Sequence, residues 1–192
     1  MKLLNKNITG VTMAVKEFGF TLIEVLVTIV ILSIGLLGVA SLQLNSLKGN
    51  QSALESSVAA ALAMEGADRV RANLPAIRDP ESGNIVSSPE YLLMDSAGSD
   101  PDCIDTGCTK EQLAQTDAFQ WISSIKQQLP NGVGVICRDS TPNDGKGGSL
   151  NEPWDPMCDK NAGTEIWAVK IAWDHDRDPS TPYLVYRMSL IP

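Results

Sequence analysis

The sequence has a single histidine, His175, in 192 residues, and no two of its cysteines are spaced as C-x-x-C. A single histidine excludes most catalytic arrangements in which histidine side chains act as general acid or base. The missing C-x-x-C pattern removes the usual dithiol redox site. No pair of carboxylates has a spacing that forces a cleft, so we expect no catalytic residues, no cofactor and no enzyme activity.

Charged residues are absent between Glu24 and Lys48, and this window holds an apolar run long enough, as a helix, to cross a hydrocarbon core of about 30 Å. Residues 1–19 contain three lysines and one glutamate, so the 15 basic and 23 acidic residues of the chain leave 12 and 22 for the remainder. A basic segment before an apolar span stays in the cytoplasm, and the chain after the span is sent across the membrane. Because the remainder is acidic, no nucleic-acid partner is expected.

The four cysteines all lie in the second half of the chain, and an even number is typical of an oxidising compartment. Cys103 and Cys108 flank a short turn, while Cys137 and Cys158 flank a polar stretch between two expected strands. Four cysteines allow three pairings, of which we expect 103–108 with 137–158. A zinc site fits poorly, because neither pair has the short spacing that is usual for zinc ligands.

Apolar residues continue at helical spacing beyond the membrane-length run, so one long helix is expected from Phe20 to Asn73. Leu74-Pro75 ends it, because proline disfavours helical geometry in its predecessor and cannot donate a backbone hydrogen bond. Only the second half of so long a helix can lie on a soluble domain. Four glycines weaken the helix, either as sites of close helix packing or as places for local unwinding: Gly35, Gly38, Gly49 and Gly66.

The remainder of the chain predicts a small α+β domain. Residues 75–108 are expected to form a long connecting loop, and a capping box at Thr109 begins a second helix over 110–129. Three β-branched or aromatic runs then predict antiparallel strands: 132–138, 164–173 and 183–191. The more apolar face of the middle strand should cover the long helix: Trp167, Val169, Ile171 and Trp173. The polar stretch 139–163 is expected to be a surface loop and a candidate recognition element.

Three alternating acids, Asp174, Asp176 and Asp178, resemble the opening of a calcium-binding loop. Pro179 stands where such a loop needs glycine, and Val185 replaces the closing acid, so an EF-hand is excluded. We favour a polar hairpin turn and expect no metal, and the three aspartates remain only weak candidates for another kind of Ca²⁺ site.

The stretch K-E-F-G followed by F-T-L-I-E-V-L-V, residues 16–27, resembles the processing site of type IV prepilins and type II secretion pseudopilins. The resemblance implies that a prepilin peptidase cuts between Gly19 and Phe20 and that the new amine of Phe20 is N-methylated. Glu24 is the fifth residue after the cut. A carboxylate within a membrane costs about 2.5–3.5 kcal/mol on insertion scales. A position near the interface would reduce this cost, but we favour pairing with the Phe20 ammonium of a neighbouring subunit.

Further stretches, among them LLGVASLQLNSLKGNQSALESS and IAWDHDRDP, resemble minor pilins of the PilV family of type IV pilus modification proteins. The resemblance implies a type IV pilin-like fold: a long N-terminal helix, with a transmembrane first half, packed on a small antiparallel sheet with one additional helix. It implies four parts. Residues 1–19 are a leader that is removed, and residues 20–42 are the transmembrane half of the long helix. Residues 43–74 are its periplasmic half, and residues 75–192 form a globular periplasmic domain.

The same resemblance implies a single-pass inner-membrane protein that later enters a pilus. The expected partners are the prepilin peptidase, other minor pilins, the major pilin and a tip adhesin. Within this class we expect a subunit of a minor-pilin complex that primes assembly and ends at the tip. A minor pseudopilin of type II secretion is the nearest alternative, followed by an adhesion module carried on the pilus.

Overall fold

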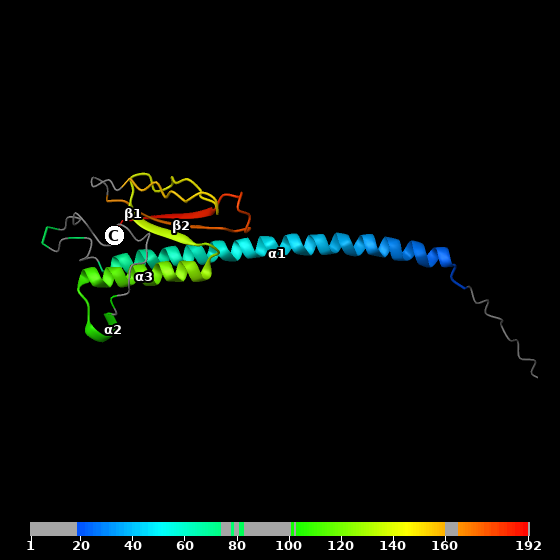
Figure 1. Cartoon of the computed structure of the whole chain (residues 1–192), viewed down its shortest axis with the longest axis horizontal. Coiled ribbons are helices and arrows are strands. Elements are labelled where there is room, and N and C mark those ends of the chain that lie inside the picture. Colours follow the sequence, from blue (N-terminus) through cyan, green and yellow to red (C-terminus); the bar gives the residue numbers. More distant parts are fainter. Residues whose placement is uncertain are drawn as a thin grey trace, which may run out of the picture. The chain divides into compact units, whose positions relative to one another are not determined.

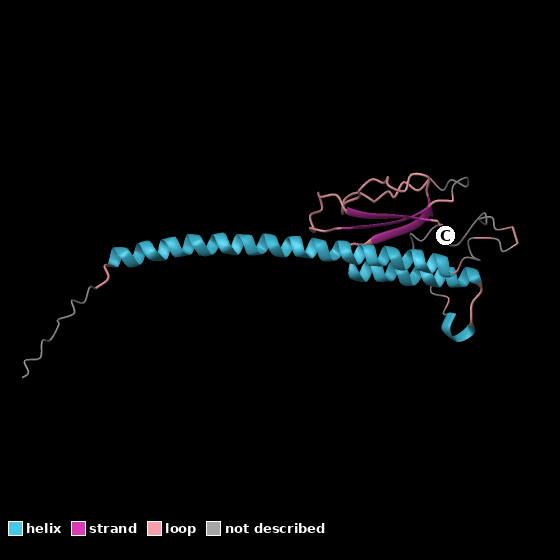
Figure 2. Ribbon diagram, turned by 180° about the vertical axis from the view of Figure 1, so that it is seen from behind, coloured by secondary structure: helices cyan, strands magenta, loops and turns pink. Residues whose placement is uncertain are grey.

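The computed structural model describes residues 19–73, 78, 81–82, 101, 103–159 and 165–191. The chain divides into two compact units, Met1–Leu47 and Lys48–Pro192. The described residues form three helices and three strands (Figures 1 and 2), which are, in chain order, α1 Leu22–Ala72, α2 Cys103–Thr106, α3 Lys110–Gln128, β1 Val133–Arg138, β2 Trp167–Trp173 and β3 Leu184–Leu190. The long helix on a small antiparallel sheet, with a further helix, confirms the expected pilin-like α+β class.

The long helix α1 has 51 residues and ends close to the predicted boundary. Its last turn is tied to the start of α3, because the side-chain amide of Asn73 donates to the carbonyl of Lys110 at 2.7 Å. The face that α1 buries in the second unit consists mainly of small residues, with two larger apolar side chains and one acid: Glu55, Ala59, Leu62, Ala63, Gly66, Ala67 and Val70.

Helix α3 begins at the predicted capping box. The Thr109 hydroxyl accepts the backbone N–H of Gln112, and the Gln112 side chain accepts the backbone N–H of Thr109. These two bonds satisfy donors that a helix start would otherwise leave unpaired. The helix ends before Leu129-Pro130, and its buried face contributes Trp121, Ile122 and Ile125 to the core.

The three strands form one antiparallel sheet in the order β1-β2-β3. In its register, Val169 lies opposite Ile136 on one side and Met188 on the other. The sheet lies over α1 and α3 in both views (Figures 1 and 2). The face predicted to cover the long helix does so, since the core cluster contains these four residues of β2 together with the buried side chains of α1 and α3: Trp167, Val169, Ile171 and Trp173.

The other face of the sheet is covered as well, which the sequence pattern did not indicate. Every residue of β2 is buried. Residues 139–159 fold back over the side of the sheet that faces away from the helices (Figures 1 and 2). Arg187 of β3 donates to the carbonyl of Asp144 at 3.0 Å, and the N–H of Tyr183 donates to the carbonyl of Gly148 at 2.7 Å. This segment, called here the outer layer, is therefore a structural layer and not merely a surface loop.

Two disulfides are present, Cys103–Cys108 and Cys137–Cys158, and this is the pairing expected from the sequence. The first closes a turn that contains the short helix α2, which lies inside the stretch expected to be loop. The second joins the end of β1 to the far end of the outer layer. Most of the expected loop, residues 75–108, lies outside the described residues.

The four helical glycines differ in their surroundings. A Cβ on Gly66 would lie 2.8 Å from Nε1 of Trp121, whereas a Cβ on Gly35, Gly38 or Gly49 would meet nothing within 4 Å. The Trp121 indole lies on α1 at this point and donates to the carbonyl of Leu62 at 2.7 Å. Gly66 is thus required by the close approach of α3, a reason that its helical position alone does not reveal.

Gly66→Ala should destabilise the second unit. The added methyl group must displace the Trp121 ring, and overpacking of this kind costs about 1–3 kcal/mol. The higher helix propensity of alanine offsets this loss of stability by less than about 1 kcal/mol. Chemical denaturation of the detergent-solubilised protein, followed by tryptophan fluorescence, measures the change because all four tryptophans lie in the second unit. Gly49→Ala is the matched control and should be neutral or stabilising, so equal stability of the two variants would contradict the role of Gly66.

Removing the Cys137–Cys158 disulfide should cost more stability than removing Cys103–Cys108. The two bonds join residues 21 and 5 positions apart, and the loop-entropy relation gives losses of about 3 and about 2 kcal/mol. Double Cys→Ser variants at each pair, compared by denaturation under identical conditions, test this order. A larger loss from the shorter loop would contradict the order expected from loop length.

Candidate processing and assembly site

The backbone from Gly19 to Thr21 lies outside any helix and is exposed, and 83% of the surface of Phe20 is accessible. Thr21 caps α1, because its hydroxyl accepts the N–H of Glu24 at 3.3 Å and its carbonyl accepts the same group at 3.1 Å. The helix therefore begins two residues after the predicted start, and threonine as a preferred cap is the signal that would have located it. The Gly19–Phe20 bond is left in a segment that a peptidase can bind in extended form.

Glu24 lies in the first turn of α1 and is exposed. A carboxylate at this end is favoured by the positive pole of the helix. Within the part of the chain that the structure describes, no basic side chain forms an ion pair with it. Any cationic partner must come from elsewhere.

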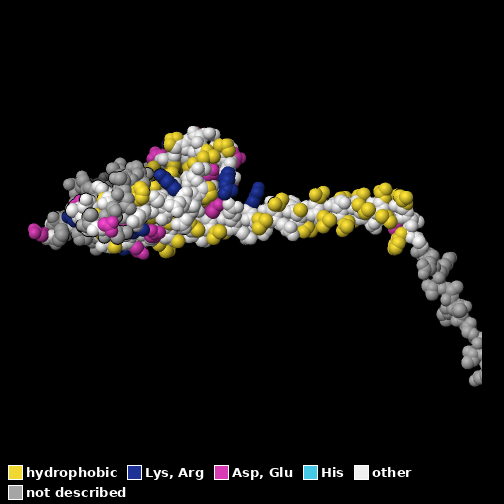
Figure 3. Space-filling view, turned by 60° about the horizontal axis from the view of Figure 1, so that its bottom comes forward, with side chains coloured by type: hydrophobic (Ala, Val, Ile, Leu, Met, Phe, Trp, Pro, Cys, Tyr) yellow, Lys and Arg dark blue, Asp and Glu magenta, His cyan; other side chains and the backbone are white. Residues whose placement is uncertain are grey.

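The part of α1 that follows Glu24 is apolar on all sides. Figure 3 shows apolar side chains along both edges of this part of the helix. The exposed fractions of its large apolar side chains, as far as Leu47, range from 46% at Val27 to 72% at Leu37. Among the described residues, α1 is the one helix long and apolar enough to cross a membrane, by length and composition. So much exposed apolar surface requires lipid or other helices around it.

Two hydroxyl side chains within this apolar stretch form hydrogen bonds inside the helix. The Thr28 hydroxyl donates to the carbonyl of Val25 at 2.8 Å, and the Ser33 hydroxyl donates to the carbonyl of Ile29 at 2.7 Å. Both bonds reach back along the same helix, so these residues need no partner. Glu24 is then the single ionisable side chain from residue 22 to residue 47.

The three aspartates considered for Ca²⁺ do not converge. Asp174 is buried, accepting the side-chain amide of Asn131 at 3.2 Å and the backbone N–H of Arg177 at 2.8 Å. Asp176 accepts the N–H of Asp178, whose own carboxylate accepts the hydroxyl and N–H of Ser180. These bonds from Ser180 lower the pKa of Asp178. Each carboxylate caps its own turn, which is the hairpin that the sequence favoured.

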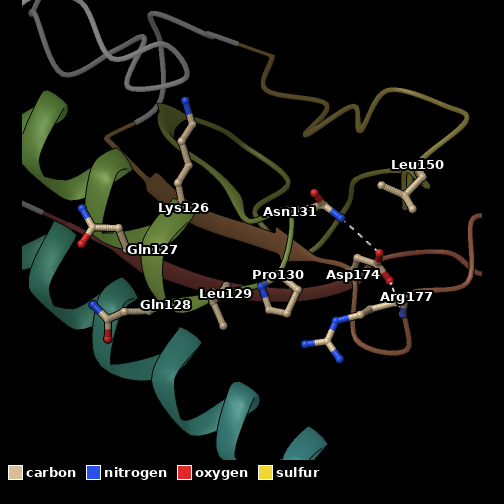
Figure 4. Close-up of a pocket in the computed structure, with 9 residues that line it drawn as sticks. All are labelled: Lys126, Gln127, Gln128, Leu129, Pro130, Asn131, Leu150, Asp174 and Arg177. Carbon is tan, nitrogen blue, oxygen red and sulfur yellow. Dashed lines mark hydrogen bonds between the residues drawn. The ribbon is translucent and has the colours of Figure 1, made fainter.

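Figure 4 shows the hollow next to Asp174, with a volume of about 540 Å³. Lys126 points away from Asp174, and Arg177 also turns aside, while the Asn131 amide donates to Asp174 (Figure 4). The remaining lining is formed by Gln127, Gln128, Leu129, Pro130 and Leu150. Among the residues that line this hollow, no nucleophilic side chain lies next to a base that could activate it.

One cluster of potential metal ligands occurs within the described residues, formed by Cys137, Asp139 and Cys158. The two sulfur atoms are bonded to each other, so neither is a thiolate that could bind a metal. A second hollow, of about 360 Å³, lies between β1 and the outer layer and is lined in part by Trp154 and Tyr183. Burial raises the pKa of Tyr183, with a smaller effect from the charge of Asp174.

Comparison with known protein families finds the prokaryotic N-terminal methylation motif over residues 15–40. No curated protein and no solved structure matches the chain. The motif implies processing by a prepilin peptidase and assembly with other pilins, and with the apolar part of α1 it is consistent with inner-membrane anchoring before assembly. Proteins with this motif are generally structural. The matched motif is the one carried by type IV pilin-like and pseudopilin proteins, and the long N-terminal helix packed on an antiparallel sheet is pilin-like.

Proposed function

We propose that the chain is a minor pilin of a type IV pilus, in a complex that primes assembly and remains at the tip. A prepilin peptidase removes residues 1–19 and methylates the amine of Phe20. Residues 20–42 then hold the protein in the inner membrane. The helix half 43–74 and the globular part 75–192 lie in the periplasm until the subunit joins other minor pilins, the major pilin and a tip adhesin.

The observation that carries this proposal is the arrangement at the start of α1. An exposed, non-helical Gly19–Phe20 bond is followed by a helix with one acid and no other charge before Lys48. The methylation motif covers this bond and the helix as far as residue 40. The cut would create a cationic amine four residues before Glu24. If two neighbouring helices are offset by these four residues, the amine of one lies beside the carboxylate of the other. The two groups attract each other strongly in an apolar bundle.

The choice of pilus over secretion pseudopilus is supported by the stretches that resemble PilV, since the methylation motif is shared by both classes. The acidic globular part also fits a subunit whose contacts are with proteins. It would bind anionic lipid or nucleic acid poorly.

Processing can be tested at the N-terminus. Mass spectrometry of the membrane-bound protein should find a chain that begins with N-methyl-phenylalanine at position 20. Gly19→Val should retain the leader, because a branched side chain would stand directly before the scissile bond. Gly10→Val, at the other glycine of the leader, should be processed normally. A wild-type protein with any other N-terminus would contradict the proposed cleavage.

Glu24→Val should leave membrane insertion and cleavage intact but prevent assembly. Loss of one partner of a desolvated ion pair costs about 3–5 kcal/mol, so co-purification with partner minor pilins should fall by at least tenfold and pili should be fewer. Thr28→Val is the matched control, because it removes a polar group one turn later whose hydrogen bond is local. Unchanged co-purification and pilus number in Glu24→Val would disprove the pairing role.

A further inference from the structure

Lys170 lies in the middle of β2, on the sheet face that the outer layer covers, and its side chain is fully buried. Fully buried lysines are rare, because an ammonium group loses its hydration on burial. The outer layer supplies the surrounding oxygens. Nζ of Lys170 donates to Oδ1 of Asp144 at 2.7 Å, to the carbonyl of Pro156 at 2.7 Å and, at 3.2 Å, to the carbonyl of Asp144.

A fourth oxygen lies closer to Nζ than any of these three. Oδ2 of Asp139 is 2.5 Å from Nζ of Lys170, and the Asp139 side chain is also fully buried. An ammonium group has three N–H donors, and the hydrogen bonds to Asp144 and Pro156 use all of them. Within the described part of the chain, Oδ2 of Asp139 accepts no hydrogen bond of acceptable geometry. The nitrogen and this carboxyl group therefore form a close ion pair whose geometry is not that of a hydrogen bond.

The Asp139 carboxyl group is also held in place. Its other oxygen, Oδ1, accepts the backbone N–H of Thr141 at 2.9 Å and the Thr141 hydroxyl at 3.3 Å. The nearby residue Cys137 is fixed by its disulfide. A buried acceptor that receives no hydrogen bond is unfavourable, and a reaction that removes Oδ2 would relieve this cost.

We propose that Lys170 and Asp139 condense to form an intramolecular amide bond, with Asp144 as the proton carrier. The Lys170 ammonium transfers one proton to the Asp144 carboxylate, and the neutral amine adds to Cγ of Asp139. The C–N bond forms, and one carboxyl oxygen leaves as water with the proton returned by Asp144 and one from the nitrogen. An ammonium and a carboxylate become an amide and water, Asp144 ends as it began, and no oxidant or reductant is needed.

The surroundings favour this reaction in three ways. The reacting groups are fixed in contact, which reduces the entropic cost of bringing them together. Lys170 and Asp139 are fully buried, so water is excluded from the bond that forms, whereas 32% of the Asp144 side chain is exposed and provides a route for the released water. The hydrogen bond from Nζ of Lys170 to Oδ1 of Asp144 provides a path for the proton, and because this bond lowers the pKa of Asp144, the carboxyl group is ionised beforehand and gives the proton up readily afterwards.

The amide bond would join the start of the outer layer to the central strand, in addition to the Cys137–Cys158 disulfide. Unlike the disulfide, it resists reduction. If the domain carries pulling force as part of a filament, the amide bond would keep the outer layer attached to the sheet.

Peptide mapping of the full-length, membrane-purified protein after reduction tests the bond directly. If the bond is present, trypsin cannot cut after Lys170, and the digest contains a branched peptide of residues 139–146 and 161–177 whose mass is lower than the sum by one water molecule. Complete cleavage after Lys170 and an unmodified 139–146 peptide in the wild-type protein would overturn the proposal. This result does not depend on any variant folding correctly.

Variants then identify the role of each group. Lys170→Arg keeps the cation but cannot condense, and Asp144→Asn keeps a hydrogen-bond acceptor but cannot carry a proton, so both should show linear peptides only. Lys126→Arg, at an exposed lysine on α3, should still give the branched peptide. A branched peptide from Asp144→Asn would remove Asp144 from the mechanism, and one from Lys170→Arg would show that another lysine is involved.

Discussion

The close approach of α3 and the sheet to a face of α1 built from small residues is the contact on which the second unit depends. Ala59, Ala63 and Ala67 are buried on this face together with Gly66. Because these side chains are short, Trp121 can lie directly on the helix and donate to the backbone carbonyl of Leu62. Larger residues on α1 would hold α3 and β2 away, and the shared core of both helices and the sheet would open.

This constraint explains why one helix can have two different kinds of surroundings. In the first unit α1 carries large apolar side chains on all sides, and none of its most apolar window is buried within the chain. In the second unit its large side chains give way to alanine and glycine where the domain packs. The change follows from the partner: lipid and other helices accept bulky side chains, whereas a sheet packed at close range requires small ones.

Local patterns in the sequence were enough to predict most of the fold. Helical spacing and Leu74-Pro75 located α1 to within two residues, and the capping box at Thr109 located the start of α3. The alternation of Trp167 with its neighbours identified the sheet face that meets the helices. These features depend on residues close together in the chain, and for this reason sequence periodicity reveals them.

The outer layer could not be predicted in the same way, because its contacts join residues that are far apart in the chain. Lys170 meets Asp144 and Pro156 across 26 and 14 residues, and a polar stretch rich in Gly, Pro and Asp has no periodicity that would indicate burial. One signal was present: a lysine in the middle of an otherwise apolar strand, with several acids in the preceding segment. At the proposed processing site, the motif points to Gly19, Phe20 and Glu24, whereas the helix that would pair with Glu24 belongs to an assembly of several chains.

In the proposed function, α1 moves from lipid into a filament. The solvation free energy of its apolar side chains changes little in this step, since a bundle of helices is about as apolar as the lipid that it replaces. The hydrophobic effect therefore contributes little to driving this step or to setting its register. Hydroxyls such as that of Thr28 bond within their own helix and are equally satisfied in both places. The carboxylate of Glu24 is the group whose free energy changes most, because it is unpaired in the described chain and is costly in an apolar medium. Under the proposed pairing, a single charge placed near the start of the helix decides both whether and at what offset two subunits join.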